Sequence, residues 1–400
     1  QSLVPCDKIG GYRFTNPQAR WELARLIRKV VRPLGPTLLK VPGVKADVAY
    51  LQSFASEVFA KRGTMGWNGR WVGDGYQMLL WASLQPEIVF DETITQRGLD
   101  GYRVLVLFDC DVLTQGVVDR VKQFQSKGGI VVGDDHLCPA VQPDIVVASY
   151  NRQGRADMDK TALQARAAEL RTALDARYQR YLDSSCPDVV PYLRRDQKTD
   201  YVFLVNDRRE YGDYVGQHGI VMENGLPAQA TVSIARPAGH VYDLVLHQSL
   251  IARAEGGRLQ VPVDLGPGDG RMLMVTERPV GGISLVVPEQ VERGAKAACQ
   301  ITVHDDQGGT LGAIVPVELR IRDPEGHEAE FSGYYATADG QLKVDLDIAA
   351  NDPHGIWTVE VRELASGKVA RQFIRVQGPQ PWPPQKEVDK QLANPVQPKG

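Results

Sequence analysis

The stretch GYRVLVLFDCDVLTQGVVDRVKQFQSKGGIVVGDDH, residues 101–136, decides the fold class. It contains two short apolar runs, at 104–108 and 130–132, which are separated by a helical pattern at 115–127. Uninterrupted apolar runs of this length are typical of strands that are buried on both faces of a parallel sheet. A strand, a helix and a second strand in this order form a βαβ unit, so the stretch predicts a parallel sheet with helices packed on it.

The same alternation extends on both sides of this stretch. Further apolar runs lie at 48–51 and 88–90, with helical patterns at 54–61 and 76–84. A longer helical pattern follows at 157–182. Repeated alternation of strand and helix predicts a doubly wound sheet, with helices on both of its faces.

The first predicted element is a helix over 16–34. Asn16 is a good N-cap, and Pro17 suits the first helical position, where its missing N–H costs nothing. The sequence PLGP at 33–36 is expected to end this helix. Its wide apolar face must pack on something, so the helix either docks on later parts of the chain or belonged with an upstream domain.

Beyond residue 201 the period of the apolar pattern changes to two, which is typical of antiparallel strands. We therefore expect a multi-domain chain, in which an α/β domain precedes two antiparallel β-sandwich domains. The expected segments are an N-terminal helical segment at 1–44, the α/β domain at 45–156, a helix and linker at 157–200, a β-sandwich at 201–278, an Ig-like domain at 279–377 and a proline-rich tail at 378–400.

The overall composition excludes several classes of protein. A net charge of −3 over 400 residues, with no basic cluster, argues against nucleic acid or an anionic membrane as partner. No apolar stretch is long enough for a membrane-spanning helix. The 5 cysteines are dispersed, so neither a disulfide framework nor a zinc site is expected, and no cofactor is predicted. Because the chain begins with Gln1, we expect a processed or excised piece.

Candidate site residues follow the strands of the predicted parallel sheet. In such sheets ligands bind beyond the carboxyl ends of the strands. The candidates there are Asp109, Asp111, Asp134, Asp135 and His136, the only histidine of the domain. These groups could hold a divalent cation or perform acid–base chemistry, but helix caps and tight turns also require aspartates, and no metal-ligand spacing is met. Cys110 and Cys138 follow neighbouring strands and are expected to lie close together.

A glycine-rich stretch at 63–75 is a second candidate. It follows a helix instead of joining a strand to one, so it is not placed as a phosphate loop. Trp67, Arg70 and Trp71 instead indicate a contact loop for a sugar or a neighbouring subunit. Packing inside the domain is an equally good role for the two tryptophans.

Three motifs in the first part of the chain resemble a known family. They are VVRPLGP at 30–36, GYRVLVL at 101–107 and FQSKGGIVV at 124–132. Residues 20–150 thereby resemble the segment that follows the catalytic barrel in family 42 β-galactosidases. The resemblance implies a class I glutamine-amidotransferase-like fold and a role in trimerisation.

The β domains carry further resemblances. Residues 201–276 resemble the β-sandwich that closes many such glycosidases, through VYDL at 241–244 and LGPG at 265–268. Residues 283–376 are similar to macroglobulin-type Ig-like modules, through RDPEG at 322–326 and HGIWTV at 354–359.

The sequence lacks the catalytic residues of both enzymes that it resembles, the amidotransferase and the glycosidase. An amidotransferase has its nucleophilic cysteine on the turn after the strand that 130–132 resembles, and this turn reads Gly-Asp-Asp-His at 133–136. We therefore expect no glutaminase activity. The 44 residues before the α/β domain cannot contain a catalytic barrel with its two glutamates.

The leading interpretation is therefore a non-catalytic, C-terminal assembly and accessory region of a secreted, glycosidase-like protein. Its expected partners are other copies of the chain or an upstream catalytic domain, and carbohydrate; its expected location is extracellular or periplasmic. Two alternatives remain open. One is a small hydrolase or metal-dependent enzyme that uses the acidic strand ends, and the other is a structural or adhesive surface protein.

Overall fold

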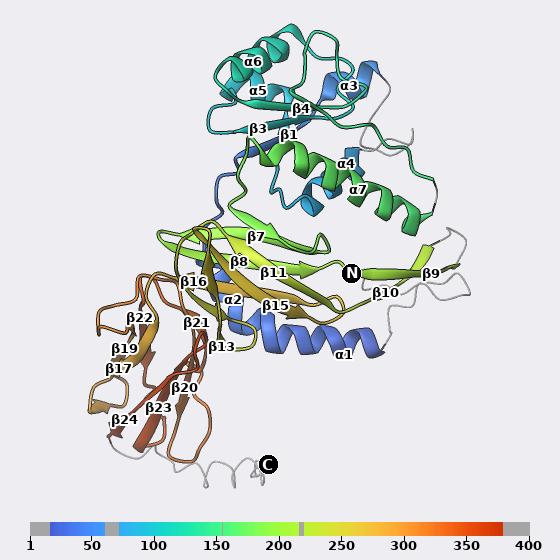
Figure 1. Ribbon diagram of the computed structural model, residues 1–400. Helices are drawn as coiled ribbons and strands as arrows, with labels where there is room; N and C mark the ends of the chain where they lie inside the picture. Colours follow the sequence, from blue (N-terminus) through green and yellow to red (C-terminus); the bar gives the residue numbers. More distant parts are fainter. Residues whose placement is uncertain (1–16, 61–71, 154, 216–219, 379–400) are drawn as a thin grey trace, which may run out of the picture.

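The computed structural model describes residues 17–60, 72–153, 155–215 and 220–378. Figure 1 shows an α/β domain, a β-sandwich and a C-terminal β module that follow one another in chain order. One parallel sheet and several antiparallel sheets confirm the expected combination of α/β and all-β structure. Within these residues, no helix is long and apolar enough to cross a membrane.

The α/β domain is built on a five-stranded sheet with the order β2-β1-β3-β4-β5, and every pair in it is parallel. This is the strand order of doubly wound sheets of the flavodoxin type. The strands are β1 (Val48–Gln52), β2 (Glu87–Phe90), β3 (Val104–Leu107), β4 (Ile130–Gly133) and β5 (Ile145–Val146); the helices are α3 (Phe54–Phe59), α4 (Val72–Trp81), α5 (Asp91–Arg97), α6 (Gln115–Ser126) and α7 (Ala156–Asp175).

Two separate cores form on the two faces of this sheet, because successive side chains of a strand point to opposite sides. Val104 and Val106 of β3 pack with residues of α4 and α7. Leu105 and Leu107 of the same strand pack with residues of α5 and α6 on the other face. The arrangement of these helices above and below the sheet is visible in Figure 1. Burial on both faces explains the uninterrupted apolar run at 104–108.

The β-sandwich consists of a four-stranded sheet, β14-β15-β11-β6, and a five-stranded sheet, β13-β12-β16-β8-β7. A hairpin of two strands, β9 and β10, extends from it. The strands are β6 (Leu182–Ser184), β7 (Val189–Asp196), β8 (Thr199–Asn206), β9 (Arg209–Val215), β10 (Ile220–Gly225), β11 (Ala228–Ile234), β12 (His240–Asp243), β13 (Gln248–Leu250), β14 (Arg253–Glu255), β15 (Arg258–Leu265) and β16 (Gly270–Thr276).

The segment at 157–200, expected as a helix and a linker, differs from that expectation. Helix α7 ends at Asp175, and the sequence after it contributes β6 and β7 to the sandwich. Pro191 and the charged run at 194–196 obscure the alternating pattern of β7 in the sequence. Because β7 is an edge strand, proline is tolerated there.

The C-terminal module also has two sheets, β17-β19-β22 and β18-β24-β23-β20-β21. Its strands are β17 (Val280–Val286), β18 (Gln290–Glu292), β19 (Lys296–Asp305), β20 (Pro316–Arg322), β21 (Gly333–Ala336), β22 (Gln341–Asp347), β23 (Gly355–Glu363) and β24 (Val369–Gln377). Its core is continuous with the outer face of the sandwich, where Tyr201, Met272 and Met274 pack against it. The Tyr201 hydroxyl donates to the Ile314 carbonyl (2.8 Å) and accepts from the Ile314 N–H (2.8 Å).

The sequence predicted that the N-terminal helix ends at 33–36, but the helix continues to Lys40. It runs as α1 (Pro17–Leu26), a π-helical turn (Ile27–Val31) and α2 (Arg32–Lys40). A proline inside a helix lacks the N–H for the regular bond and crowds the carbonyl four residues earlier. The wider π turn directly before α2 relieves this crowding at Pro33, so the helix continues.

Helix α2 docks on the C-terminal module, but most of the apolar face predicted for 16–34 is exposed, namely Leu23, Leu26, Ile27 and Val31. Leu34 is only 1% exposed and belongs to the shared core. The Lys40 Nζ donates to the Ala336 carbonyl at the end of β21 (2.6 Å). Earlier in the helix, Trp21 and Val31 are exposed.

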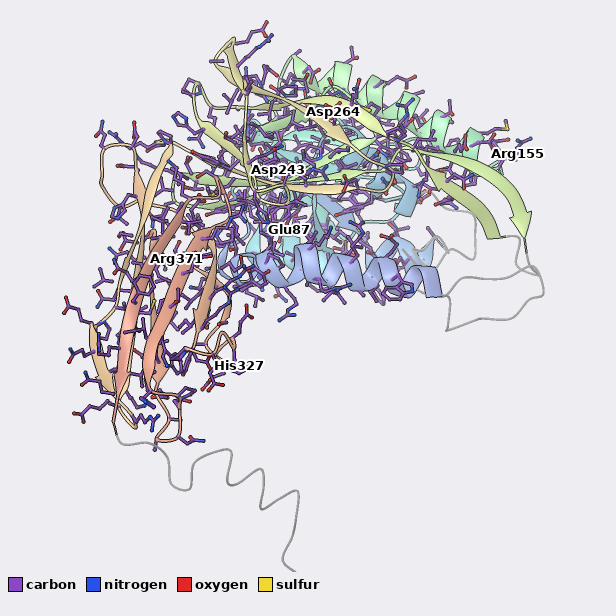
Figure 2. The ribbon with its side chains drawn as sticks, turned by 90° about the horizontal axis from the view of Figure 1, so that it is seen from below. Glu87, Arg155, Asp243, Asp264, His327 and Arg371 are labelled. Atoms are coloured by element: carbon purple, nitrogen blue, oxygen red, sulfur yellow. The ribbon has the colours of Figure 1, made fainter. Side chains whose placement is uncertain are left out.

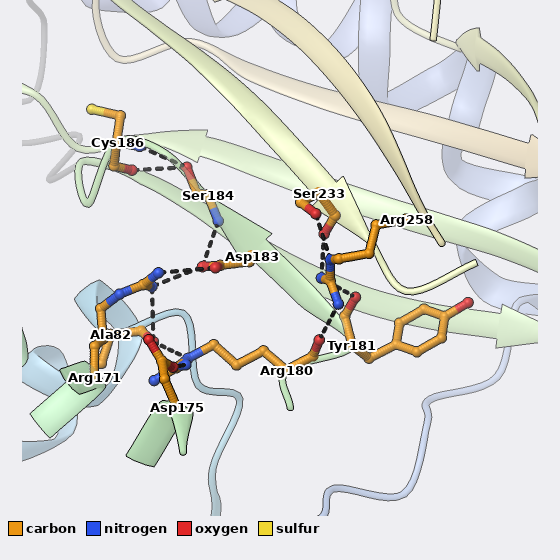
Figure 3. Close-up of polar contacts among 10 residues, drawn as sticks. All are labelled: Ala82, Arg171, Asp175, Arg180, Tyr181, Asp183, Ser184, Cys186, Ser233 and Arg258. Carbon is orange, nitrogen blue, oxygen red and sulfur yellow. Dashed lines mark hydrogen bonds and ion pairs between the residues drawn. The ribbon is translucent and has the colours of Figure 1, made fainter. Parts of the chain in front are cut away.

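Polar contacts join the α/β domain to the sandwich. Figure 3 shows Arg171 of α7 bound through two hydrogen bonds to Asp183 of β6 (2.7 and 2.9 Å). In the same view, Arg180 donates through Nε to the Ala82 carbonyl (2.8 Å), and Arg258 of β15 donates to the Arg180 carbonyl (3.0 Å). Because a planar guanidinium group donates its hydrogen bonds in a fixed geometry, these contacts hold the two domains in one orientation.

Candidate functional site

The carboxyl ends of β3 and β4 meet at one edge of the parallel sheet, as the sequence predicted. Asp109 follows β3, Asp134 follows β4, and both side chains are buried. The Asp134 carboxylate accepts from the backbone N–H of Asp109 (2.8 Å) and from that of His136 (3.1 Å). Asp134 therefore holds two neighbouring strand ends together through its two oxygens.

The other candidates lie further out on the same edge. The exposed Asp135 accepts from the backbone N–H of Ser149 (2.9 Å), while Asp111 and His136 are half-buried. The His136 ring makes no hydrogen bond with another described residue. Across the described ranges, no group of three or more His, Cys, Asp or Glu side chains is arranged to hold a metal ion.

A left-handed backbone conformation occurs at Asp109, with φ of +56°. Non-glycine residues rarely adopt this conformation, although aspartate tolerates it better than most. Nucleophiles of α/β-hydrolases lie on sharp turns between a strand and a helix. The resemblance placed such a turn at Gly133–His136, after β4, whereas the left-handed residue follows β3.

Cys110 and Cys138 are close together, as expected from their strands. The Cys138 N–H donates to the Cys110 carbonyl (2.8 Å), and both thiols are free. Burial raises the pKa of the Cys110 thiol well above its usual value, and the carboxylates of Asp134 and Asp91 raise it further. A thiol in this environment stays protonated, so it is a poor nucleophile.

Asp91 is a residue of this edge that the sequence analysis missed, whereas Ser53 lies at the end of β1 as expected and caps α3 through a bond from the Ser56 N–H (3.3 Å). Asp91 begins α5 directly after β2, and one carboxylate oxygen accepts from the Ser53 hydroxyl (3.1 Å) and from the Ala55 N–H (3.1 Å). Its other oxygen is buried without a hydrogen bond to the rest of the described chain. The rule that selected Asp109, a carboxylate directly after a strand, also applies to Asp91.

The buried phenol of Tyr50 completes the apolar side of this edge. Its ring packs edge-on against Phe108, with 5.9 Å between the ring centroids. Burial raises the pKa of Tyr50 well above its usual value, and interactions with Cys110 and with nearby carboxylates, Asp109 first among them, raise it further. At neutral pH the described edge therefore offers a neutral thiol, a neutral phenol and carboxylates that bind backbone N–H groups. This arrangement stabilises the strand ends.

The predicted contact loop with Trp67, Arg70 and Trp71 lies outside the described residues. A different contact surface is exposed at the β2 edge of the sheet. Its members, here named the β2-edge patch, are Phe54, Val58 and Phe59 of α3 with Ile88 and Phe90 of β2. The bonds from Ser53 and Ala55 to Asp91 bring the start of α3 next to the end of β2, so the members of the patch lie on neighbouring elements.

Comparisons with known proteins give partial structural similarities. No family model and no curated protein matches the sequence. The α-L-fucosidase isoenzyme 2 from Paenibacillus thiaminolyticus is 16% identical with a TM-score of 0.47, covering 66% of this chain and 53% of that chain. A β-galactosidase from Bacillus circulans sp. alkalophilus is 12% identical with a TM-score of 0.42, covering 68% and 46%.

A third similar structure is a catalytic mutant of a family 42 β-galactosidase from G. stearothermophilus. It is 12% identical with a TM-score of 0.41, and the match covers 65% of this chain and 44% of that chain. The chain thus spans about half the length of these three solved structures.

Proposed function

We propose that this chain is a non-catalytic assembly and accessory region of a carbohydrate-active, glycosidase-like protein, and that it self-associates through its α/β domain. The observation that carries the assembly role is the β2-edge patch. Phe59 is 75% exposed and Phe54 is 62% exposed. Large apolar side chains that are exposed together mark interaction sites.

The position of the patch suits an interface between copies. Strand β2 is an edge strand of the parallel sheet, so its outer backbone groups have no strand neighbour among the described residues. Ile88 and Phe90 are exposed on this strand, although parallel sheets are usually covered on both faces. Burying the patch would contribute on the order of 25 cal/mol per Å² of apolar area, which supports a stable assembly if several hundred Å² are covered.

The non-catalytic part of the proposal is supported by the strand-end carboxylates. Asp134 and Asp135 accept hydrogen bonds from backbone N–H groups, as residues that stabilise turns do. The carbohydrate part rests on the resemblance of 20–150 and 201–276 to the regions that follow the barrel in glycosidases.

The oligomeric state of the full chain tests this proposal. We expect a mass above that of the monomer by light scattering, which falls to the monomer mass in Phe59→Ser/Phe90→Ser. The control variant is Leu39→Ser/Ile251→Ser, which removes two exposed apolar side chains outside the patch. A monomer at every concentration tested, or equal dissociation by both variants, would contradict the assembly role.

A further inference from the structure

The outer face of the larger sheet in the C-terminal module has an unusual set of side chains. Strands β24, β23 and β20 are neighbours in it. Ile374 and Trp357 point into the core, so the alternate positions point outward. The outward residues are Val369, Arg371, Phe373 and Arg375 of β24, Ile356, Thr358, Glu360 and Arg362 of β23, and Glu318, Arg320 and Arg322 of β20.

Phe373 is the centre of this face and is 56% exposed. It is paired with Thr358 of β23, which is paired in turn with Arg322 of β20. Arg371 and Arg375 lie two positions away on either side along β24, at about 7 Å. The aromatic ring is therefore surrounded by arginines in three directions. Figure 2 labels Arg371 on this sheet.

The charges on the face are unevenly balanced. Arg371 is paired with Glu360, Arg320 with Glu318 (2.7 Å) and Arg322 with Glu328 (3.6 Å). The other two arginines, Arg362 and Arg375, make no ion pair with any described residue. This surplus of positive charge occurs on a chain with a net charge of −3.

The face is open around Phe373 and closed at its other end. Helix α2 covers the end of β20 and β21, where Pro316 and Ala336 are buried and Lys40 binds the Ala336 carbonyl (2.6 Å). Ile356, close to Phe373 across the strands, is also exposed. The open part, here named the platform, has Phe373 and Ile356 at its centre and Arg322, Arg371 and Arg375 around them.

We propose that this platform binds an acidic polysaccharide. The ring of Phe373 offers a flat apolar surface for one face of a sugar ring. Arg375 is free to bind a carboxylate or sulfate group through two N–H donors. Glu360 and Thr358 add acceptors for sugar hydroxyl groups. The proposal deepens the carbohydrate part of the proposed function and rests on it.

A nucleic acid fits the platform less well. Binding to a phosphate backbone gains its affinity from many lysines and arginines that each neutralise a phosphate. Here the glutamates Glu318 and Glu360 alternate with the arginines across the strands, so the face has no continuous row of basic side chains to follow a phosphate backbone. Alternating donors and acceptors around one aromatic ring suit hydroxyl-rich rings with a charge on some of them.

Calorimetric titration of the full chain tests the proposal, with polygalacturonate and dextran sulfate as acidic probes and dextran as the neutral one. We expect binding to an acidic probe that weakens with added NaCl, because exposed charges are screened. In Phe373→Ala/Arg375→Gln the Kd should rise about tenfold. The matched control, Ile251→Ala/Arg253→Gln, removes an exposed apolar side chain and an exposed arginine on the sandwich and should bind as wild type does.

Three outcomes would overturn the proposal: equal binding of dextran, equal weakening in both variants, or full competition by single-stranded DNA. Thermal unfolding of both variants verifies that they are folded. The platform and the β2-edge patch are on different domains. Titration therefore tests polysaccharide binding, and light scattering tests self-association, independently of each other. A monomeric chain that binds polygalacturonate would contradict the assembly role alone.

Discussion

Asp134 illustrates how this molecule uses buried charge at the scale of single residues. Its two carboxylate oxygens accept from the N–H groups of Asp109 and His136, which belong to the ends of two neighbouring strands. Charged acceptors make stronger hydrogen bonds than neutral ones. The negative charge then acts on the adjacent Cys110, whose thiol is held in the protonated form.

We predict a pH dependence of stability that originates from Cys110. Burial raises the pKa of its thiol in the folded state above the value in the unfolded chain. The contribution of this group is thus fully present below the unfolded pKa, about 8.5, and is lost as the pH rises toward the folded pKa. The free energy of unfolding should fall by about 1.4 kcal/mol per pH unit in this window.

Urea unfolding of wild type and Cys110→Ala, below that pKa and one unit above it, measures the difference. The variant should lose less stability between the two conditions than wild type does. An equal loss in both proteins would show that Cys110 does not contribute.

At this scale the sequence predicts positions but not contacts. The apolar runs place Asp109 and Asp134 correctly at the sheet edge, because parallel strands end at the same side. What each carboxylate binds depends on the loop backbone, such as the left-handed conformation at Asp109, and apolar periodicity carries no information on loops. Asp91 was missed for a different reason, since the position rule was not applied to β2.

At the scale of elements, two leucines of α2 test whether this helix packs on the C-terminal module. Leu34 is 1% exposed in the shared core, whereas Leu39 on the same helix is 90% exposed. We predict that Leu34→Ala lowers the free energy of unfolding by about 2–4 kcal/mol, because it removes buried methyl groups and leaves a cavity. Leu39→Ala should change it by less than about 0.5 kcal/mol.

Thermal and urea unfolding of the two variants give this comparison directly. Similar stabilities for Leu34→Ala and Leu39→Ala would mean that α2 does not pack on the C-terminal module in solution.

The elements themselves were predictable where one pattern dominates the sequence. The four apolar runs of the parallel sheet became β1 to β4: β1, β3 and β4 are buried on both faces and have no competing pattern, and the run at the exposed edge strand β2 is apolar as well. The end of the first helix was not predictable from proline chemistry alone, because a π turn admits Pro33. Strand β7 was hidden because Pro191 and three charged residues interrupt its alternation at an exposed edge.

At the scale of the whole molecule, the two junctions between domains differ in chemistry. The junction of the α/β domain with the sandwich is polar, and Lys160 is its most buried cation apart from Arg180 among the described residues. The Lys160 Nζ contacts the Asp188 carboxylate (2.7 Å) and donates to the Asp207 carbonyl (2.8 Å). The junction with the C-terminal module is a continuous apolar core.

We predict that Lys160→Met uncouples the α/β domain from the sandwich. Removing one partner of a buried ion pair costs about 3 kcal/mol. The Asp188 carboxylate keeps its bond from the Gln164 side chain (2.8 Å) but loses its cation. Differential scanning calorimetry should show a separate unfolding transition of the α/β domain at lower temperature. Lys127→Met, which removes an exposed ion pair with Asp100, is the control and should leave the profile unchanged. A single unaltered transition for Lys160→Met would show that Lys160 does not couple the two domains.

The shared core also governs how such a chain can be recombined during evolution or in protein engineering. A recombination crossover near residue 278 would separate the two β units. Tyr201, Met272 and Met274 would then lose the apolar residues of the C-terminal module against which they pack. The hybrid protein would need a replacement domain with a complementary apolar surface. We therefore expect the two β units to be inherited together, whereas the polar junction at Lys160 allows the α/β domain to be exchanged by replacing a few charged pairs.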